Sequence, residues 1–145
     1  MDQSTALADL HRHQHEALAL LSEWLDAIDA GPAVLAARNE DLRERLGSVL
    51  GAYQQFKHAG IFDPAVGSAD AERMRLGRSM KIECIAAGEV FRSHQKRWTP
   101  DAIAQDWPSY RIDARLSVNA LRRHIAAERE GIEMLIVRYY PERVG

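Results

Sequence analysis

Residues 121–136, LRRHIAAEREGIEMLI, form the stretch that decides the fold. Their apolar positions recur at three- and four-residue steps, which is typical of a helix with one buried stripe. Continued along the helix, that stripe passes through Glu128, between Ile125 and Ile132. Burying a carboxylate is costly unless another group pairs with it. We therefore expect a different part of the chain to supply a partner for Glu128.

His124 precedes Glu128 by four residues, and residues four apart are neighbours on a helix. The two therefore form an inward-facing His-x-x-x-Glu pair, which we expect to be the centre of a polar site. Histidines and carboxylates that converge from different helices are the way in which metal sites are built in helical bundles.

The composition indicates one globular domain spanning residues 1–145, with 46% hydrophobic residues and a net charge of −2. Acidic and basic residues are interleaved, so no nucleic-acid or membrane surface is expected. A single cysteine excludes an intrachain disulfide and a multi-cysteine zinc site. Acidic residues at the start argue against a signal peptide, and no segment approaches the length of a membrane span. We expect a soluble, cytoplasmic protein.

Helix signals fill four long segments, and strand signals are missing. The segments are residues 4–28, 33–62, 69–98 and 107–138, with a short helix opened by Thr99-Pro100 before the last of them. Gly31-Pro32 is expected to end the first segment, Asp63-Pro64 and Gly67-Ser68 to break the chain after the second, and Ser68 to cap the third. Short turns force neighbouring helices to be antiparallel. The predicted fold is therefore all-α: an up-down-up-down four-helix bundle.

The other candidate polar residues lie on different segments. His11 and His15 flank the apolar stripe of the first segment, whereas His13 is expected in solvent. His58 lies off the stripe of the second segment, and His94 lies near a bundle end.

Cys84 lies on the core stripe of the third segment, where a lone cysteine usually behaves as a small hydrophobe. No histidine stands at helical spacing to activate it. No glycine-rich phosphate loop or nucleophile elbow occurs, so we do not expect an enzyme.

Four stretches resemble the hemerythrin-like (HHE, cation-binding) domains of bacteria. They are His15 with the following EALALLSEWLDAI, then FKHAGIFDPAV, RSHQKRWTPDAIAQDWPSYR and HIAAEREGIEMLI. The resemblance implies a four-helix bundle with a metal in its core and places His15, His124 and Glu128 in ligand positions. Family members with a di-iron centre carry His-x-x-x-Glu on the second helix, where this chain has Tyr53 and Lys57.

Because too few ligands remain for an iron pair, we expect a degenerate site or a single iron or zinc ion. His124→Ala should then abolish metal binding, whereas His13→Ala should not. The ammonium of Lys57 is our predicted partner for Glu128. His11, Tyr53 and His58 complete the possible polar core.

Two alternatives remain open. GIFDP after a histidine is similar to the four-helix regulators that sequester the housekeeping sigma factor of bacterial RNA polymerase. Such a protein would bind a protein partner through its surface, for example through a basic patch of Arg111, Arg115, Arg122 and Arg123. The other alternative is an active non-haem di-iron protein that binds oxygen or nitric oxide.

Overall fold

The computed structural model describes residues 1–142, which are helical throughout apart from short connections and contain no strand. The elements are α1 (Gln3–Asp29), α2 (Pro32–Gln55), the π-helix η1 (Phe56–Phe62), α3 (Asp63–Val66), α4 (Ala71–Arg97), α5 (Pro100–Gln105) and α6 (Trp107–Tyr139). The prediction of an all-α fold is confirmed.

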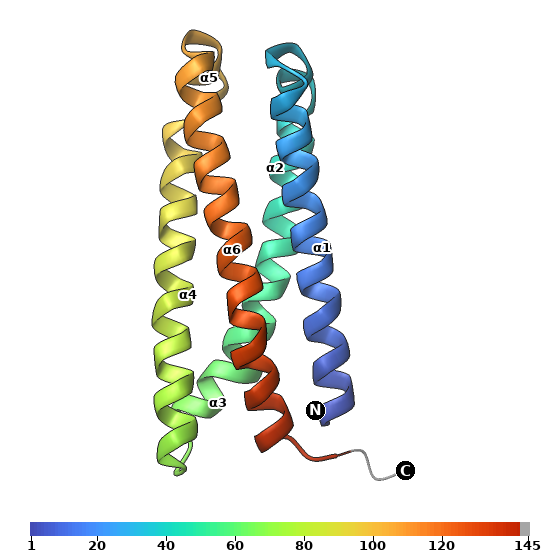
Figure 1. The fold of residues 1–145 in the computed structure, drawn as a ribbon, viewed down its shortest axis with the longest axis vertical. Helices are drawn as coiled ribbons and strands as arrows, with labels where there is room; N and C mark the ends of the chain where they lie inside the picture. The colour runs from blue at the N-terminus through green and yellow to red at the C-terminus, as the bar shows by residue number, and fades with distance from the viewer. Residues whose placement is uncertain (143–145) are drawn as a thin grey trace.

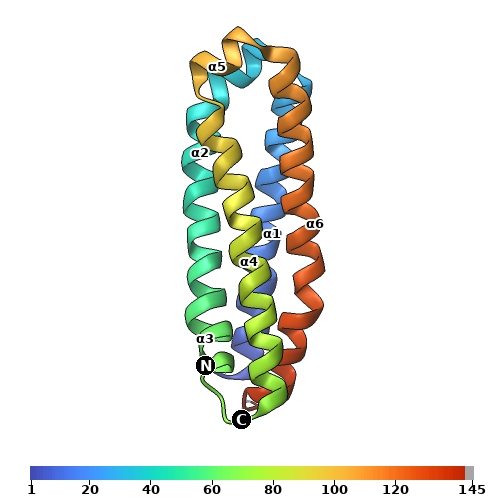
Figure 2. The same ribbon diagram turned by 90° about the vertical axis from the view of Figure 1, so that its left-hand side faces the viewer.

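The four long helices α1, α2, α4 and α6 lie side by side along the longest axis of the molecule (Figures 1 and 2). Helix α1 packs against α2 and α6, and α4 packs against α6. The N-terminus and the end of α6 lie at the same end of the molecule as α3 (Figure 1). There the backbone N–H of Gln3 donates to the carbonyl of Pro141 over 2.8 Å. The turn between α1 and α2 lies with α5 at the opposite end.

Polar side chains cap helices α1, α4, α5 and α6 where the chain enters them. The Thr99 side chain accepts from the N–H of Ala102, which confirms the predicted start of the short helix α5. The predicted cap at Ser68 is wrong. Asp70 caps α4 instead, because the helix begins at Ala71, and the Ser68 hydroxyl accepts from the N–H of Asp70.

The second predicted helix differs from the structure at its end. Helix α2 ends at Gln55, seven residues of π-helix follow, and the helical path continues past Pro64 into α3. Pro64 is the second residue of α3, which directly follows the π-helix. The break expected at Asp63-Pro64 therefore does not occur, whereas the one expected at Gly67-Ser68 does, because α3 ends at Val66.

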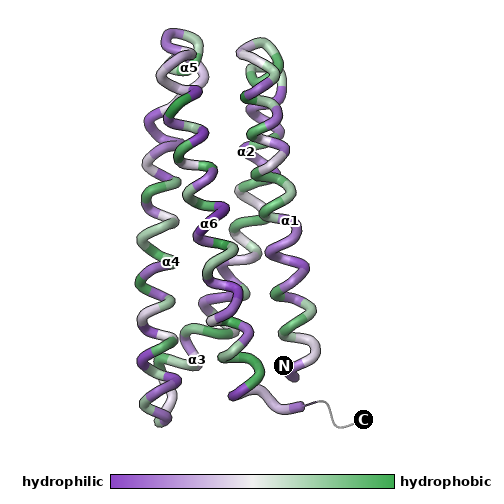
Figure 3. Tube along the Cα trace, in the orientation of Figure 1, coloured by the Kyte–Doolittle hydropathy of each residue, from purple (hydrophilic) through white to green (hydrophobic). Residues whose placement is uncertain are grey.

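Apolar and polar residues alternate along each long helix (Figure 3). The predicted stripe of α6 is confirmed, since its members are all buried: Val118, Leu121, Ile125, Ile132 and Leu135. The stripe expected on α1 contains six residues, of which Leu10, Leu21 and Ile28 are buried, whereas Leu7, Leu18 and Leu25 are only partly buried. Ala17 is buried in addition. The small alanines that face the neighbouring helices are weak apolar markers, so the predicted register of α1 is slightly rotated.

That rotation turns His13 inward, and its predicted exposure to solvent is wrong. His13 is only 7% exposed. Its ring centroid lies 5.8 Å from that of Tyr53 and 5.1 Å from that of Phe56.

None of the helices in residues 1–142 combines the length and hydropathy needed to cross a membrane.

Candidate functional site

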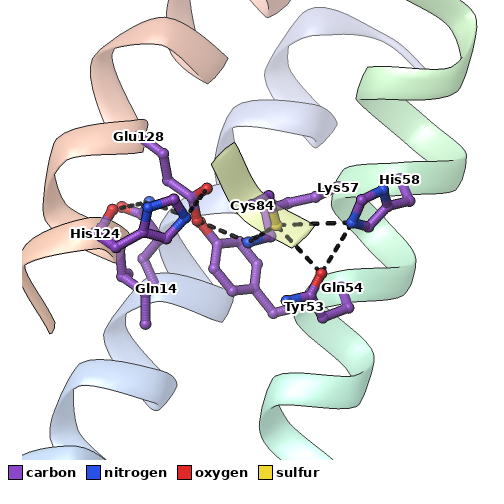
Figure 4. Close-up of polar contacts among 9 residues, drawn as sticks. Gln14, Tyr53, Gln54, Lys57, His58, Cys84, His124 and Glu128 are labelled. Carbon is purple, nitrogen blue, oxygen red and sulfur yellow. Dashed lines mark hydrogen bonds and ion pairs between the residues drawn. The ribbon is translucent and has the colours of Figure 1, made fainter. Parts of the chain in front are cut away.

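Six polar residues meet between the long helices, and we call them the core cluster (Figure 4). They come from every long helix and from the π-helix. The members are Gln14 on α1, Tyr53 on α2, Lys57 on η1, Cys84 on α4, and His124 and Glu128 on α6.

One carboxylate oxygen of Glu128 is fully occupied by two donors. Oε1 accepts from the Tyr53 hydroxyl over 2.7 Å and from Lys57 Nζ over 2.8 Å. The side chain of Lys57 is 2% exposed and that of Glu128 is 4% exposed. The predicted pairing of Lys57 with Glu128 is therefore confirmed. Tyr53 is a second partner, and a buried ion pair needs such additional hydrogen bonds to offset the cost of removing its charges from water.

Gln14 orients Tyr53 and is the cluster member that sequence reasoning missed. Its Nε2 donates to the Tyr53 hydroxyl over 2.9 Å and to the carbonyl of Ile125 over 3.0 Å. Because the hydroxyl accepts from Gln14, its own proton is free to point at Glu128. The spacing of Leu10, Gln14, Ala17 and Leu21 follows the 3–4 repeat and could have identified Gln14.

The other carboxylate oxygen of Glu128 has no hydrogen bond. Oε2 lies 3.1 Å from His124 Nε2, four residues back on the same helix. The two groups are not aligned for hydrogen bonding, and both buried atoms lack a hydrogen-bond partner among the described residues. Such buried atoms are uncommon in folded proteins and call for an explanation, one of which is a bound ion.

Cys84 is a polar member of the cluster, so its predicted role as a small hydrophobe is wrong. Lys57 Nζ donates to its sulfur over 3.1 Å. The thiol also lies 3.3 Å from Gln54 Oε1 and 3.7 Å from His58 Nε2. His58 thus belongs to the edge of the cluster. The groups near Cys84 come from other helices, which is why spacing within one helix did not reveal them.

Electrostatic effects within the cluster favour charged groups. Contacts with Cys84 and then Glu128 raise the pKa of His124 to about 9. Burial works to raise the pKa of Cys84, but His124 and Lys57 outweigh it, so that pKa is lowered. Burial likewise opposes ionisation of Glu128, yet His124 and Lys57 lower its pKa. At neutral pH, the positive charges of Lys57 and His124 therefore face the Glu128 carboxylate. They also face the Cys84 thiol, which ionises more readily than an ordinary cysteine.

Burial, followed by the charge of Glu128, raises the pKa of Tyr53. Tyr53 therefore stays protonated and acts as a hydrogen-bond donor to Glu128. Burial, followed by Lys57, lowers the pKa of His58, so the uncharged form of this imidazole is favoured beside Cys84.

Three residues of the core cluster could hold a metal ion. Cys84, His124 and Glu128 each offer one ligand atom, and these atoms lie within 4.8 Å of one another. The structure does not bring His15 to this group, since His15 lies on the exposed face of α1. The third candidate ligand, beside His124 and Glu128, is therefore Cys84 and not His15, which the sequence had suggested. His11 is also outside the cluster, and its Nε2 lies 2.9 Å from Glu133 Oε1 at the surface.

Two cavities reach the cluster from different sides. One of about 310 Å³ lies between α2, α4 and α6, and Tyr53, Lys57, Cys84 and His124 are among its lining residues. Another of about 260 Å³ lies between α4 and α6, and its lining includes His124 and Glu128. A water molecule takes up roughly 30 Å³ of liquid volume. Small solutes therefore have room to approach Cys84, His124 and Glu128.

A separate polar group surrounds His94 and does not join the core cluster. His94 Nδ1 lies 2.8 Å from Asp113 Oδ2, which also accepts from Trp98 Nε1 over 2.7 Å. The His94 side chain is buried, although its position near a bundle end suggested access to water. These bonds join the end of α4 to α6, so His94 has a structural role.

The chain matches no protein-family model, no curated protein and no solved structure in comparisons with known proteins.

Proposed function

We propose that this chain is a hemerythrin-like protein: an up-down-up-down four-helix bundle that is not an enzyme and holds one metal ion in its core. The side-by-side arrangement of the four long helices supports the bundle. The cluster around His124 and Glu128 supports the resemblance, because these are the residues that it places in ligand positions. The free Cys84 thiol fits a reducing compartment such as the cytoplasm.

A di-iron centre does not fit the residues that are present. The second-helix ligand positions hold Tyr53 and Lys57, and both donate hydrogen bonds to Glu128 Oε1. That oxygen is therefore engaged, and an ammonium group occupies space beside it. A second metal ion would have to displace Lys57 and would find no carboxylate or histidine of α2 in its place.

A single ion does fit, and the carrying observation is that ligand atoms of Cys84, His124 and Glu128 lie within 4.8 Å of one another. His124 Nε2 and Glu128 Oε2 lack hydrogen bonds, and Cys84 lies in the same group. A thiolate, an imidazole and a carboxylate suit zinc better than the harder ions. Three protein ligands leave a fourth position for water. When bound, the ion would supply a charge that these three groups share.

A titration of the metal-free protein with Zn²⁺ or Co²⁺ tests this proposal. One equivalent should bind, and Co²⁺ should produce a thiolate-to-cobalt charge-transfer band. Removing an outer-shell partner of a metal typically weakens binding about 10–100-fold. Loss of a direct ligand in Cys84→Ser, His124→Ala or Glu128→Gln should therefore weaken it at least as much.

His15→Ala is the matched control, because His15 is the ligand that the sequence favoured and it is exposed in the structure. This change should leave the affinity unaltered. An equal loss in His15→Ala and His124→Ala would mean that the ion adsorbs at the surface. A cobalt complex without a thiolate band would exclude Cys84 as a ligand.

The regulatory alternative gains no support from the predicted basic patch. Arg115 Nη1 lies 3.3 Å from Asp29 Oδ1, and Arg122 donates to Asn119. Two of the four arginines are therefore already engaged within the molecule, although a protein partner that binds elsewhere remains a prediction.

A further inference from the structure

Lys57 and Cys84 contact each other inside the core cluster. Nζ lies 3.1 Å from Sγ, and both residues are only 1% exposed. Lys57 Nζ also lies 4.0 Å from the centroid of the Tyr53 ring and donates to Glu128. The two atoms are thus held together from different elements, with Lys57 on η1 and Cys84 on α4.

Cys84 has no second cysteine with which to form a disulfide, since the chain contains only one. An oxidised cysteine that lacks a thiol partner can condense with nitrogen to give a sulfenamide. Nζ of Lys57 is a nitrogen in direct contact with Cys84 Sγ, at 3.1 Å. The cavity of about 310 Å³ that both residues line gives a small oxidant a route to the sulfur.

We propose that hydrogen peroxide converts the Lys57–Cys84 contact into a covalent, reversible sulfenamide link between Nζ and Sγ. The link rests on the geometry of this contact and forms in the metal-free protein, so it does not depend on the proposed function. A metal ion on Cys84 would hold the sulfur and protect it.

The reaction balances in two steps. The Cys84 thiolate attacks hydrogen peroxide, an S–O bond forms and the O–O bond breaks. Sulfur is oxidised by two electrons to a sulfenic acid, the peroxide is reduced, and the departing hydroxide takes a proton from the Lys57 ammonium to form water. The Lys57 amine then attacks sulfur, an S–N bond forms, the S–O bond breaks, and a second water leaves with one amine proton.

The link changes the cluster in two ways. It removes the ammonium that pairs with Glu128 Oε1, and it removes the thiolate that would bind a metal. Oxidation should therefore switch off metal binding without any change in fold. A thiol reductant should cleave the S–N bond and restore both groups.

The experiment treats the full, chelator-washed chain with hydrogen peroxide, followed by proteolysis and mass spectrometry. The peptides containing Lys57 and Cys84 should appear as one linked species, lighter than their sum by two hydrogen atoms. Dithiothreitol should separate them. Lys57→Arg keeps the positive charge but should give only oxygen adducts of Cys84. The matched control Lys81→Arg, at the surface beside Asp63, should still form the link.

Oxygen adducts of Cys84 without any link in the wild-type chain would overturn the proposal, as would a Cys84 that does not react. Because Lys57→Arg could fail to fold, urea-unfolded wild-type chain provides a second comparison. The link should be lost in urea, since the 3.1 Å contact exists only in the folded chain. Equal yields in folded and unfolded chain would also overturn the proposal.

Discussion

Glu128 shows how one buried carboxylate can organise side chains from several helices. Its Oε1 is engaged by Tyr53 and Lys57, whereas its Oε2 faces His124 without a hydrogen bond. Replacing both members of a buried ion pair is often tolerated, but removing one leaves a charge without compensation. The consequences of changing this site therefore depend on which partner is removed.

Lys57→Met should destabilise the metal-free protein by roughly 3–5 kcal/mol, because it leaves Glu128 without its cation. Lys57→Met with Glu128→Leu should recover much of that loss, since both charges are then gone. A double-mutant cycle from urea unfolding measures the coupling. Additive losses in that cycle would show that the 2.8 Å contact contributes nothing to stability.

The same Lys57→Met change should strengthen zinc binding. The ammonium lies beside Cys84 Sγ, a candidate ligand atom, and beside the Glu128 carboxylate, and it repels an incoming cation. Calorimetric titration of the wild type and the variant checks this. A variant that binds zinc more weakly than the wild type would mean that Lys57 positions the ligands rather than opposing the ion.

His124 should titrate at a pKa of about 9 in the metal-free protein, which an NMR titration of its ring measures. The groups that face it are Cys84, Glu128 and Lys57. Because the folded pKa lies above the ordinary value of 6.5, the charge on His124 contributes stability below pH 6.5. That contribution is lost as the pH rises through about 9.

Glu128→Gln is the check on this assignment, since it removes the carboxylate charge that raises the pKa of His124. The pKa should fall in the variant. An unchanged pKa would mean that Glu128 does not interact with the ring.

At the scale of the elements, the π-helix η1 carries the residue that distinguishes this cluster. Lys57 is the second residue of η1, which follows α2, and a π-turn is wider than an α-turn. The N–H of Asp63 donates to the carbonyl of His58, five residues earlier. Helical periodicity predicted a helix here but not a π-helix, because the hydrophobic pattern of seven residues does not separate the two geometries.

Gly77 is required by the close approach of α4 to α3. A Cβ on Gly77 would lie 2.4 Å from Cβ of Ala65, so the two helices would have to move apart. Gly77→Ala should destabilise the protein by about 1–3 kcal/mol, as overpacking does. Thermal or urea unfolding measures the change.

Gly47→Ala in α2 is the matched control, because a Cβ there meets nothing within 4 Å. Alanine is the better helix former, so this variant should gain roughly 0.5–1 kcal/mol. Similar effects of the two changes would contradict the packing of α3 on α4.

At the scale of the whole molecule, the sequence predicted the helical class and, except at the end of α2, the boundaries of the long helices to within a few residues. It also predicted the Lys57–Glu128 pair, since both lie on or near strong apolar stripes. It did not predict that Gln14 and His13 face inward. Burial in α1 depends on alanines and on contacts with α2 and α6, which one helix considered alone does not contain.

Cys84 illustrates the same limit in the candidate site. Its polar neighbours Lys57, His58 and His124 stand on other elements, so only the packed structure reveals them. His15 was favoured by resemblance and by proximity to the stripe, but a rotation of α1 leaves it exposed. Residues at the edge of a stripe are the ones for which a small rotation decides between core and solvent.

The most direct test of the central claim is the metal content of the protein after incubation with excess zinc and ferrous iron under air, followed by desalting. Elemental analysis should find one zinc ion per chain, and the absorption spectrum should show no oxo-to-iron charge-transfer bands. Cys84, His124 and Glu128 would then account for the ion. Two irons per chain with such bands, or no retained metal, would contradict a single-ion site in the core cluster.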